Sequence, residues 1–514
     1  MVQAASLICL VVGALLVAVV THIAVPPATW LALILLLHAS RSMPAVLGIL
    51  YLWLAVYAAL AIGNRGIVPV PGAAYFGIVA FLATTVSLPF VLDRFVAPRL
   101  GALGSTLIFP VAFVAAEFLR SRLSPAATWG SLAYTQYGNL PLMQLAAFVG
   151  LWGITFLMAW FASTFDWAWS RSFAWDVVRT PVLTCAAVVA LAVAGGSIRL
   201  ALAPSDRPSL RMATLNRPVD LFAPGEMTRI AEGRVSSEER TRLAQKLTRL
   251  HDWFLDGSRR EARGGARLVA WPEQNLLIFK EDEPAFIARA QRLAVEEGVY
   301  LAMGLGTVSV GAPLPFENKS VLIDPSGTVM VSYLKTHPVA GWEASIMKPG
   351  DGRLPVIGTK EGRMATAICF DADFPEFIRQ AGLGSADLLV VPANDWRDIK
   401  DLHAQMAAFR AIENGVPLIR PAASGISTAV DPWGRVLGVA DYFGPGDRTL
   451  VVQVPIGRVP TLYARTGDLF AWLCVAALVA ALAIAVVNPD GLSAGPHGRM
   501  SSRSSASAAA TVSP

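Results

Sequence analysis

Long apolar runs constrain the fold of this chain more than any other feature of its sequence. Only 15% of its 514 residues are charged, compared with about 25% in an ordinary soluble domain. A membrane-spanning helix needs about 20 apolar residues. Runs of about this length, together with a shorter run at 28–40, predict seven helices before residue 205 and one after residue 460. The longer runs lie near 5–25, 44–63, 71–92, 105–120, 143–165, 180–198 and 468–487.

The charged residues divide the chain into an apolar part and a polar part. No lysine occurs before Lys246, and most acidic residues lie between about 205 and 450. The pattern predicts a transmembrane domain over 1–204, a soluble domain over 205–460 and a C-terminal transmembrane helix over 461–490. The Ser- and Ala-rich tail at 491–514 is typical of disorder.

Arginines in the short loops predict the orientation of these helices. The net charge of +5 is modest, and loop arginines that set membrane topology explain it better than nucleic-acid binding does. With the N-terminus inside, the outside loops hold Arg65, Arg120 and Arg122. The inside positions are richer, with Arg41, Arg94, Arg99, Arg171 and Arg179 in the loops and Arg499 and Arg503 in the tail. The bias places 205–460 outside the cytoplasm, and the loss of one helix before that domain would reverse the assignment.

The polar region alternates strand-like and helix-like segments, which predicts an α/β layered domain. Helical patterns occupy 236–262, 284–297, 375–381 and 401–414. Short apolar runs typical of strands lie at 210–218, 267–271, 300–307, 320–324, 328–333, 365–369, 387–392, 417–420 and 427–430.

Three reactive side chains lie at the predicted ends of such strands. Glu273 follows the apolar run 268–270, Lys335 follows a second strand, and Cys369 ends the run 365–369. A thiol becomes a good nucleophile when a base removes its proton and a cation stabilises the thiolate. Each residue alone has a common structural explanation, such as a surface charge or a buried cysteine. Together they predict a Glu-Lys-Cys site.

The order Glu, Lys, Cys, with these local contexts, resembles the nitrilase (carbon–nitrogen hydrolase) superfamily. The resemblance implies a nitrilase-like αββα sandwich beside the multi-span α-helical membrane domain. It also implies that Glu343 is a second active-site glutamate, by its spacing from Lys335. Four further residues become candidates for supporting the site or binding substrate: Trp342, Phe370, Asp371 and Asn394.

Two segments of the membrane part extend the resemblance. The stretch 128–137, Thr-Trp-Gly-Ser-Leu-Ala-Tyr-Thr-Gln-Tyr, is typical of an interfacial aromatic belt. Glu117 and Arg120 are interpreted as a self-paired cluster that reaches to the interface. Both segments are similar to those of the apolipoprotein N-acyltransferase family. That family implies a bacterial inner-membrane enzyme with an extracytoplasmic catalytic domain, a phospholipid acyl donor, a diacylated lipoprotein acceptor, and no metal or organic cofactor.

The chain departs from the family pattern around the site, and this keeps an alternative open. Ala340-Gly341-Trp342 replaces the usual Pro-Phe-Gly, and Phe370-Asp371 replaces an aromatic residue followed by glutamate. A membrane-tethered amidase would use the same three residues, with water as the second nucleophile. A non-enzymatic scaffold is a third hypothesis, and the intact Glu-Lys-Cys set argues against it.

Overall fold

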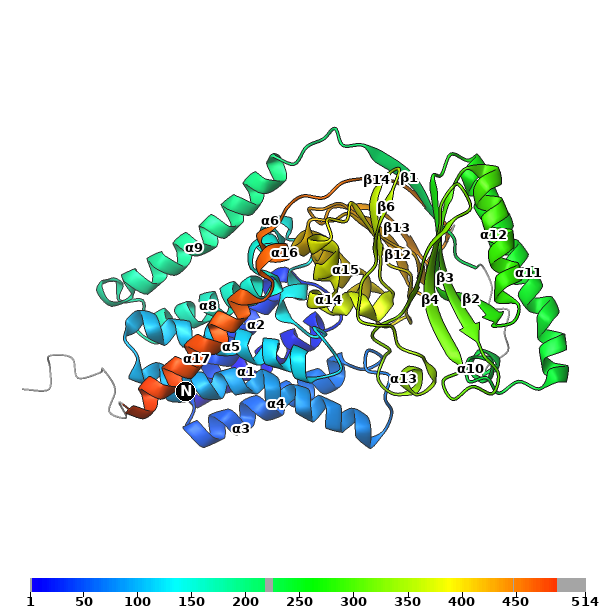
Figure 1. Cartoon of the computed structure of the whole chain (residues 1–514). Coiled ribbons are helices and arrows are strands. Elements are labelled where there is room, and N and C mark those ends of the chain that lie inside the picture. The colour runs from blue at the N-terminus through cyan, green and yellow to red at the C-terminus, as the bar shows by residue number, and fades with distance from the viewer. Residues whose placement is uncertain (1, 218–224, 447, 488–514) are drawn as a thin grey trace, which may run out of the picture.

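The computed structural model describes residues 2–217, 225–446 and 448–487. It shows a helical half packed against an α/β half (Figure 1). The predicted tail at 491–514 lies outside the described residues.

Long helices build the N-terminal half, as the apolar runs predict. Within the described ranges, seven of them precede the α/β domain and one follows it. They are α1 Val2–Val20, α2 Pro26–Ser42, α3 Ala45–Gly63, α4 Ala73–Val96, α5 Ala102–Leu123, α8 Leu151–Trp169, α9 Trp175–Ala201 and α17 Leu469–Val487.

Five of these helices (α3, α4, α5, α9 and α17) are long and apolar enough to cross a membrane, and a bent pair would make a sixth span. The chain is therefore a multi-pass membrane protein, and the count of eight spans stays a prediction.

In the bent pair, the run predicted as one helix over 143–165 turns by 119° between Leu140–Val149 and Leu151–Trp169. Gly150 has a φ of +69°, and a Cβ there would lie 2.6 Å from the Tyr463 ring. The bend therefore requires glycine. The short helices before it are α6 Leu140–Met143 and α7 Ala146–Val149.

Two six-stranded mixed sheets form the centre of the second half. The first sheet has the order β14-β1-β2-β3-β4-β5, and the second has the order β13-β12-β10-β8-β7-β6. The first contains β1 Ser209–Thr214, β2 Leu268–Phe279, β3 Tyr300–Val308, β4 Phe316–Ile323, β5 Val329–Leu334 and β14 Leu450–Pro455. The second contains β6 Val356–Thr359, β7 Gly362–Thr366, β8 Leu388–Val390, β10 Leu418–Arg420, β12 Ile426–Val430 and β13 Val436–Asp441, and the small pair is β9 Ala393–Asn394 with β11 Ala422–Ala423.

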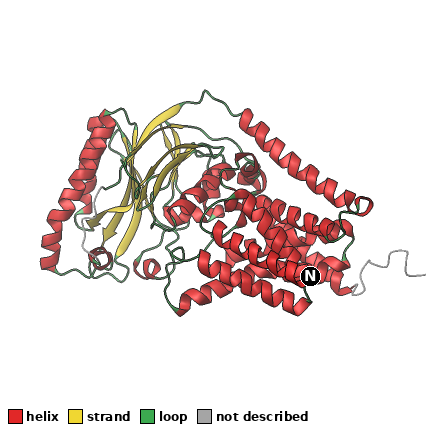
Figure 2. Cartoon of the chain, turned by 180° about the vertical axis from the view of Figure 1, so that it is seen from behind, coloured by secondary structure: helices red, strands yellow, loops and turns green. Residues whose placement is uncertain are grey.

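Helices cover the outer face of each sheet, so the domain is the expected αββα sandwich (Figures 1 and 2). On one side lie α11 Ser237–Arg263 and α12 Glu283–Glu297, and on the other α14 Pro375–Leu383 and α15 Lys400–Asn414. Four buried apolar residues of α11 recur every three or four positions, which is the spacing of one helix face. They are Leu243, Leu247, Leu250 and Phe254. The remaining short elements are η1 Ala97–Arg99, η2 Leu132–Gln136, α10 Glu226–Ala231, α13 Trp342–Ile346, η3 Cys369–Asp373 and α16 Leu462–Thr466.

The layer formed by α14 and α15 is shared with the membrane half. One buried apolar cluster runs from the second sheet through this layer into α5 and α8. The Tyr134 and Phe409 rings meet edge to face at 5.1 Å, and Glu413 accepts a hydrogen bond of 3.1 Å from the Leu151 amide. The two halves therefore form one packed body rather than a domain on a flexible tether.

Packing within the membrane half and against the α/β half corrects two interpretations of the membrane segments. Much of the stretch 128–137, interpreted as an interfacial belt, is buried, and Gln136 is 0% exposed. Glu117 and Arg120 are also buried rather than reaching to the interface. Glu117 accepts hydrogen bonds from the Leu132 amide and the Thr155 hydroxyl. Arg120 donates to the Trp129 carbonyl, so each side chain holds the loop in place.

Candidate active site

Glu273 lies within a long strand rather than at the end of a short one. The strand β2 continues to Phe279, with a shift in its pairing to β3 between Trp271 and Leu276. Gln274, inside this irregularity, has a φ of +51°. Bulges of this kind redirect side chains near functional sites. Here the carboxylate is buried, with only 2% of Glu273 exposed.

Lys335 follows β5 directly, as predicted, and its ammonium group contacts two carboxylates. Nζ donates to Glu273 Oε1 at 2.9 Å and to the two oxygens of Glu343 at 2.8 and 3.0 Å. The side chain is buried, so water does not compete for these bonds. The structure thus brings together the lysine and both predicted glutamates.

Glu343 and Trp342 begin the short helix α13, but they face different surroundings. Glu343 Oε2 also accepts a 2.6 Å hydrogen bond from the Val339 amide, which fixes this carboxylate on the lysine. Trp342 is 47% exposed, and its indole N–H donates to Glu232 at 2.8 Å. Trp342 therefore borders the site without contacting the lysine or thiol in any described hydrogen bond.

Cys369 opens a tight turn after β7. The predicted strand 365–369 is observed over Gly362–Thr366, and η3 begins at Cys369 itself. Cys369 has a φ of +47°, a strained region for a residue with a Cβ. Its amide donates to the Pro392 carbonyl at 2.8 Å, and its thiol lies 3.7 Å from the Asn394 carbonyl oxygen. Strain of this kind recurs at functional sites because surrounding contacts hold it.

The remaining predicted residues support this turn in different ways. Phe370 packs edge to face on Phe374, with ring centres 5.2 Å apart. Asp371 is buried and accepts hydrogen bonds from the Tyr333 hydroxyl at 2.7 Å and the His337 amide at 2.8 Å. It therefore anchors the loop after Lys335. Asn394 contributes its main-chain carbonyl to the thiol's surroundings.

The charges of the site influence one another strongly. Burial raises the pKa of Glu273, while Lys335 and a hydrogen bond with the Cys369 thiol oppose the rise. Burial would lower the pKa of Lys335, but Glu273 and Glu343 hold it well above its ordinary value. Burial and the Glu273 charge raise the pKa of the Cys369 thiol, with Lys335 acting in the opposite direction. The resting site thus holds a neutral thiol beside a cationic lysine.

Sequence reasoning missed several polar residues around the site. Asn318 donates to Glu273 Oε1 at 2.6 Å. It lies on β4, which begins at Phe316 instead of the predicted residue 320, so its side chain was not placed on the sheet. A second missed group lies behind the thiol, where Arg420 donates to both oxygens of Asp395. The signals in the sequence were the apolar run 417–420, which ends in an arginine, and the polar segment 394–396, which could line the pocket or cap the next helix.

Family models match both halves of the chain. Residues 12–164 match the apolipoprotein N-acyltransferase N-terminal domain, and residues 238–462 match the carbon–nitrogen hydrolase family. The chain is 29% identical over 440 residues to the apolipoprotein N-acyltransferase of Geobacter metallireducens, covering 79% of this chain and 80% of that protein. It is 28% identical over 459 residues to the corresponding protein of Rhodopseudomonas palustris, covering 82% and 80%.

A solved structure aligns with about half of the chain. An amidase from Nesterenkonia sp. aligns with a TM-score of 0.39 and 21% identity, over 52% of this chain and 97% of the amidase. The assignment rests instead on the two family models and on the relatives that extend through both halves. The chain belongs to the apolipoprotein N-acyltransferase family, within the carbon–nitrogen hydrolase superfamily.

Proposed function

We propose that the protein moves a fatty acyl chain from a membrane phospholipid to the α-amino group of a lipoprotein's N-terminal diacylglyceryl-cysteine, through a thioester on Cys369. The observation that carries the proposal is the buried contact of Lys335 with Glu273 and Glu343 beside that thiol. A base, a cation and a nucleophile in contact are what acyl transfer needs. Membership of the family supplies the class of donor and acceptor.

In the first half-reaction, Glu273 removes the thiol proton as Sγ attacks the ester carbonyl carbon of the phospholipid. Lys335 stabilises the oxyanion of the tetrahedral intermediate. When the intermediate collapses, the ester C–O bond breaks and the lysophospholipid oxygen takes the proton back from Glu273. An acyl thioester remains on Cys369.

In the second half-reaction, the neutral α-amine attacks the thioester carbonyl. Glu273 accepts the proton from the amine, and Lys335 again faces the oxyanion. The C–S bond then breaks, and the thiolate takes the proton from Glu273. The products are an amide and the free enzyme, so the cycle balances without a cofactor.

The packing of the α/β half on the membrane helices suits these substrates. Both the donor and the acceptor are lipids that stay in the bilayer, and a site seated on membrane helices reaches them without extracting them. We place the catalytic domain on the extracytoplasmic side of the inner membrane, because the arginine bias of the short loops favours that orientation.

An assay with two lipid substrates tests the reaction. Purified enzyme receives phospholipid and a diacylated lipopeptide with a free amino terminus, and products are identified by mass spectrometry. We expect N-acylated peptide with equimolar lysophospholipid, and no more than about one lysophospholipid per enzyme when the lipopeptide is omitted. Ammonia release from small amides, without lysophospholipid or acylated Cys369, would support the amidase alternative and overturn the proposal.

Thiol labelling tests the orientation separately. A cysteine at Ala285, on the exposed surface of α12, is expected to react with a membrane-impermeant maleimide in spheroplasts. Labelling only after the membrane is ruptured would reverse the orientation. The unsubstituted protein is the control for its own four cysteines.

A further inference from the structure

A histidine that the proposed reaction does not use lies buried behind the nucleophile. His403, in the first turn of α15, is 3% exposed. Its Nδ1 lies 2.7 Å from Asp395 Oδ1, and its Nε2 lies 3.2 Å from Asp373 Oδ1. The imidazole therefore bridges two carboxylates that belong to different segments, through a hydrogen bond with Asp395 and a longer ionic contact with Asp373.

One of these carboxylates belongs to the nucleophile's own turn. Asp373 is the last residue of η3, which begins at Cys369. The other, Asp395, directly follows Asn394, whose carbonyl lies beside the thiol. Sγ of Cys369, a ring nitrogen of His403 and an oxygen of Asp395 all lie within 4.8 Å of one another. The bridge thus lies directly against the strained residue.

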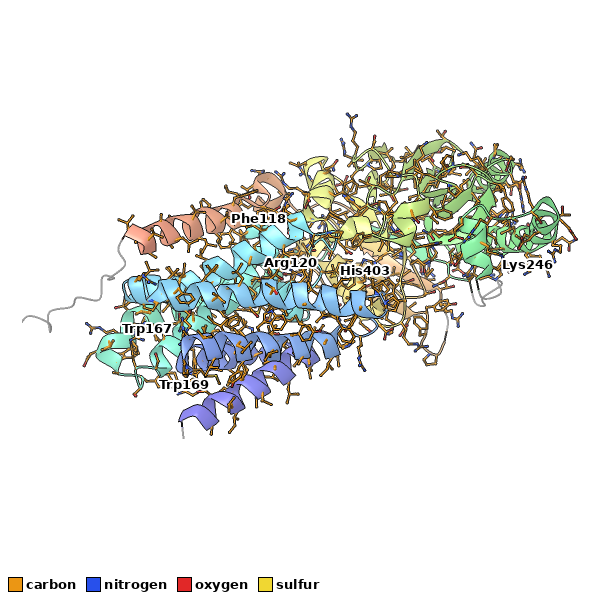
Figure 3. All side chains as sticks on the ribbon, turned by 90° about the horizontal axis from the view of Figure 1, so that it is seen from below. Phe118, Arg120, Trp167, Trp169, Lys246 and His403 are labelled. Atoms are coloured by element: carbon orange, nitrogen blue, oxygen red, sulfur yellow. The ribbon has the colours of Figure 1, made fainter. Side chains whose placement is uncertain are left out.

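The same bridge reaches the membrane half. Asp373 Oδ2 accepts a 2.7 Å hydrogen bond from the Trp129 indole, and the Asp373 carbonyl accepts one of 2.8 Å from the Thr128 hydroxyl. The Trp129 ring lies 5.5 Å from the His403 ring, centre to centre. Arg120 at the end of α5 fixes the Trp129 carbonyl. Figure 3 shows Arg120 and His403 near the boundary between the helices and the α/β half.

The charges of this cluster balance when the imidazole is protonated. Burial would lower the pKa of His403, but Asp373 and Asp395 raise it to about 9, with Arg420 opposing them. Two carboxylates then face one imidazolium and the Arg420 guanidinium. A thiol, an imidazole and a carboxylate could bind a soft metal ion. Here Arg420 already occupies both Asp395 oxygens, at 2.7 and 3.0 Å, so the trio is better explained as an ion-pair network.

We propose that His403 is a positioning residue that holds the Cys369 turn in its reactive conformation and links that turn to Trp129 of the membrane half. The inference rests on the proposed role of Cys369 as nucleophile. Without the bridge, the end of η3 loses its tie to α15, and the thiol relaxes away from Glu273 and Lys335. Small misplacements of a reacting atom cost about 10²-fold in rate.

The test compares His403→Gln with His251→Gln, a matched control. His251 is also buried, but it bonds the Leu277 carbonyl under the other helix layer. Two readouts are used in full-length protein: kcat and KM for acyl transfer, and the rate of Cys369 alkylation by iodoacetamide, followed on the Cys369 peptide. We expect His403→Gln to lower kcat and the alkylation rate about 10- to 100-fold while KM changes less than about twofold. The control should stay within about twofold of the wild type in both.

Trp129→Phe extends the test across the interface. We expect a smaller loss than for His403→Gln, and little further loss when both are combined, because both substitutions break one chain of contacts. If His403→Gln does not accumulate in membranes, Asp373→Asn removes the same charge pairing at constant shape and should give the same loss.

Equal alkylation rates and kcat in the wild type and in a folded His403→Gln protein would overturn the inference. Fully additive losses for Trp129→Phe and His403→Gln would overturn the link to the membrane half. Absence of acyl transfer by the wild type, with an alkylation rate that still depends on His403, would refute the proposed function and uphold this inference.

Discussion

Arg41 at the helix ends of the membrane half and Lys335 at the candidate active site each lie between two carboxylates; the arginine side chain is 19% exposed, and the lysine is buried. In the membrane half, Arg41 of α2 donates to both oxygens of Asp93 on α4, each at 2.8 Å, and to Asp166 on α8 at 2.7 Å. Asp166 also contacts His38 at 2.7 Å. In the α/β half, Lys335 lies between Glu273 and Glu343.

The two clusters differ in what remains available for chemistry. The Arg41 guanidinium is a rigid fork whose bonds tie three helices together, an arrangement suited to structure. Lys335 is a compact charge, and both Lys335 and Asn318 donate to the same oxygen of Glu273, Oε1. The charge of this carboxylate also acts on the Cys369 thiol and raises the thiol's pKa. A similar charge pattern thus ties helices together in the membrane half and forms a candidate reaction centre in the α/β half.

The largest expected effect on acyl transfer comes from replacing the Cys369 thiol, a group that the membrane cluster lacks. Cys369→Ser should reduce acyl transfer at least about 10³-fold and abolish the thioester, because the hydroxyl is far harder to deprotonate. Its yield and melting temperature in detergent should match the wild type. An acyl adduct that forms at another residue of the variant would show that the nucleophile is misassigned.

Neutralising each cluster as a whole should separate reaction from structure. The triple variant Glu273→Gln, Lys335→Met, Glu343→Gln is expected to fold and to lose all measurable transfer. The triple variant Arg41→Met, Asp93→Asn, Asp166→Asn should retain activity within about threefold, because replacing a complete buried ion network is often nearly neutral.

A single substitution in the membrane cluster supplies the contrast for these triple variants. Arg41→Met alone leaves two buried carboxylates without their cation, at a cost of about 3–5 kcal/mol. Its yield in the membrane should fall below that of the triple variant. Loss of activity in a well-folded Arg41 triple variant would mean that the membrane cluster also serves the reaction.

Glu343→Gln should have a smaller effect than Cys369→Ser or the triple substitution at the active site. The amide keeps an acceptor for Lys335 but removes a charge that holds the lysine protonated and in place. We expect kcat to fall about 10- to 100-fold with KM little changed. Glu283→Gln is a suitable control, because Glu283 contacts Lys319 and Lys280 outside the site. A loss as large as that of Glu273→Gln would give Glu343 a more direct role.

The smallest expected effect is on how the stability of the protein depends on pH, and it concerns Glu413 at the junction between the halves. Burial raises the pKa of Glu413 from 4.5 to about 7, although Arg410 opposes the shift. Between these values the folded state binds more protons than the unfolded state, so Glu413's contribution to stability falls as pH rises and levels off above about 7. Glu413→Gln should flatten this decline, with a change in melting temperature of roughly 2–4 °C per kcal/mol. An identical pH profile in both proteins would contradict the assignment.

The sequence was a good guide wherever a local pattern decides the structure. The apolar runs predicted the long helices, the short alternating segments predicted an α/β layered domain, and the family resemblance predicted the sandwich. Glu273, Lys335 and Glu343 were each marked by position or spacing, and the structure brings them into contact with one another. Their catalytic roles stay predictions.

Residues whose surroundings are set by distant contacts were harder to predict. Trp129 was read as part of an aromatic belt because only docking against η3 and α15 places its indole on Asp373. Asn318 needs the register of β4 against β3, which propensity does not fix to one residue. The bend at Gly150 depends on the close approach of Tyr463, more than three hundred residues away in the chain.

The pairing of β1 with β14 has a consequence for how the protein is made. These strands, antiparallel from Ser209–Pro455 to Thr214–Leu450, are the first and last of the α/β half; β1 follows the membrane helix α9, and β14 precedes the membrane helix α17. During synthesis β1 emerges long before β14, so the edge of its sheet stays open until nearly the whole chain has been translated. The apolar side of α14 and α15, by contrast, finds its membrane partners already inserted. We expect the helical half to act as a template for the later half, with closure of the sheet edge as the final step.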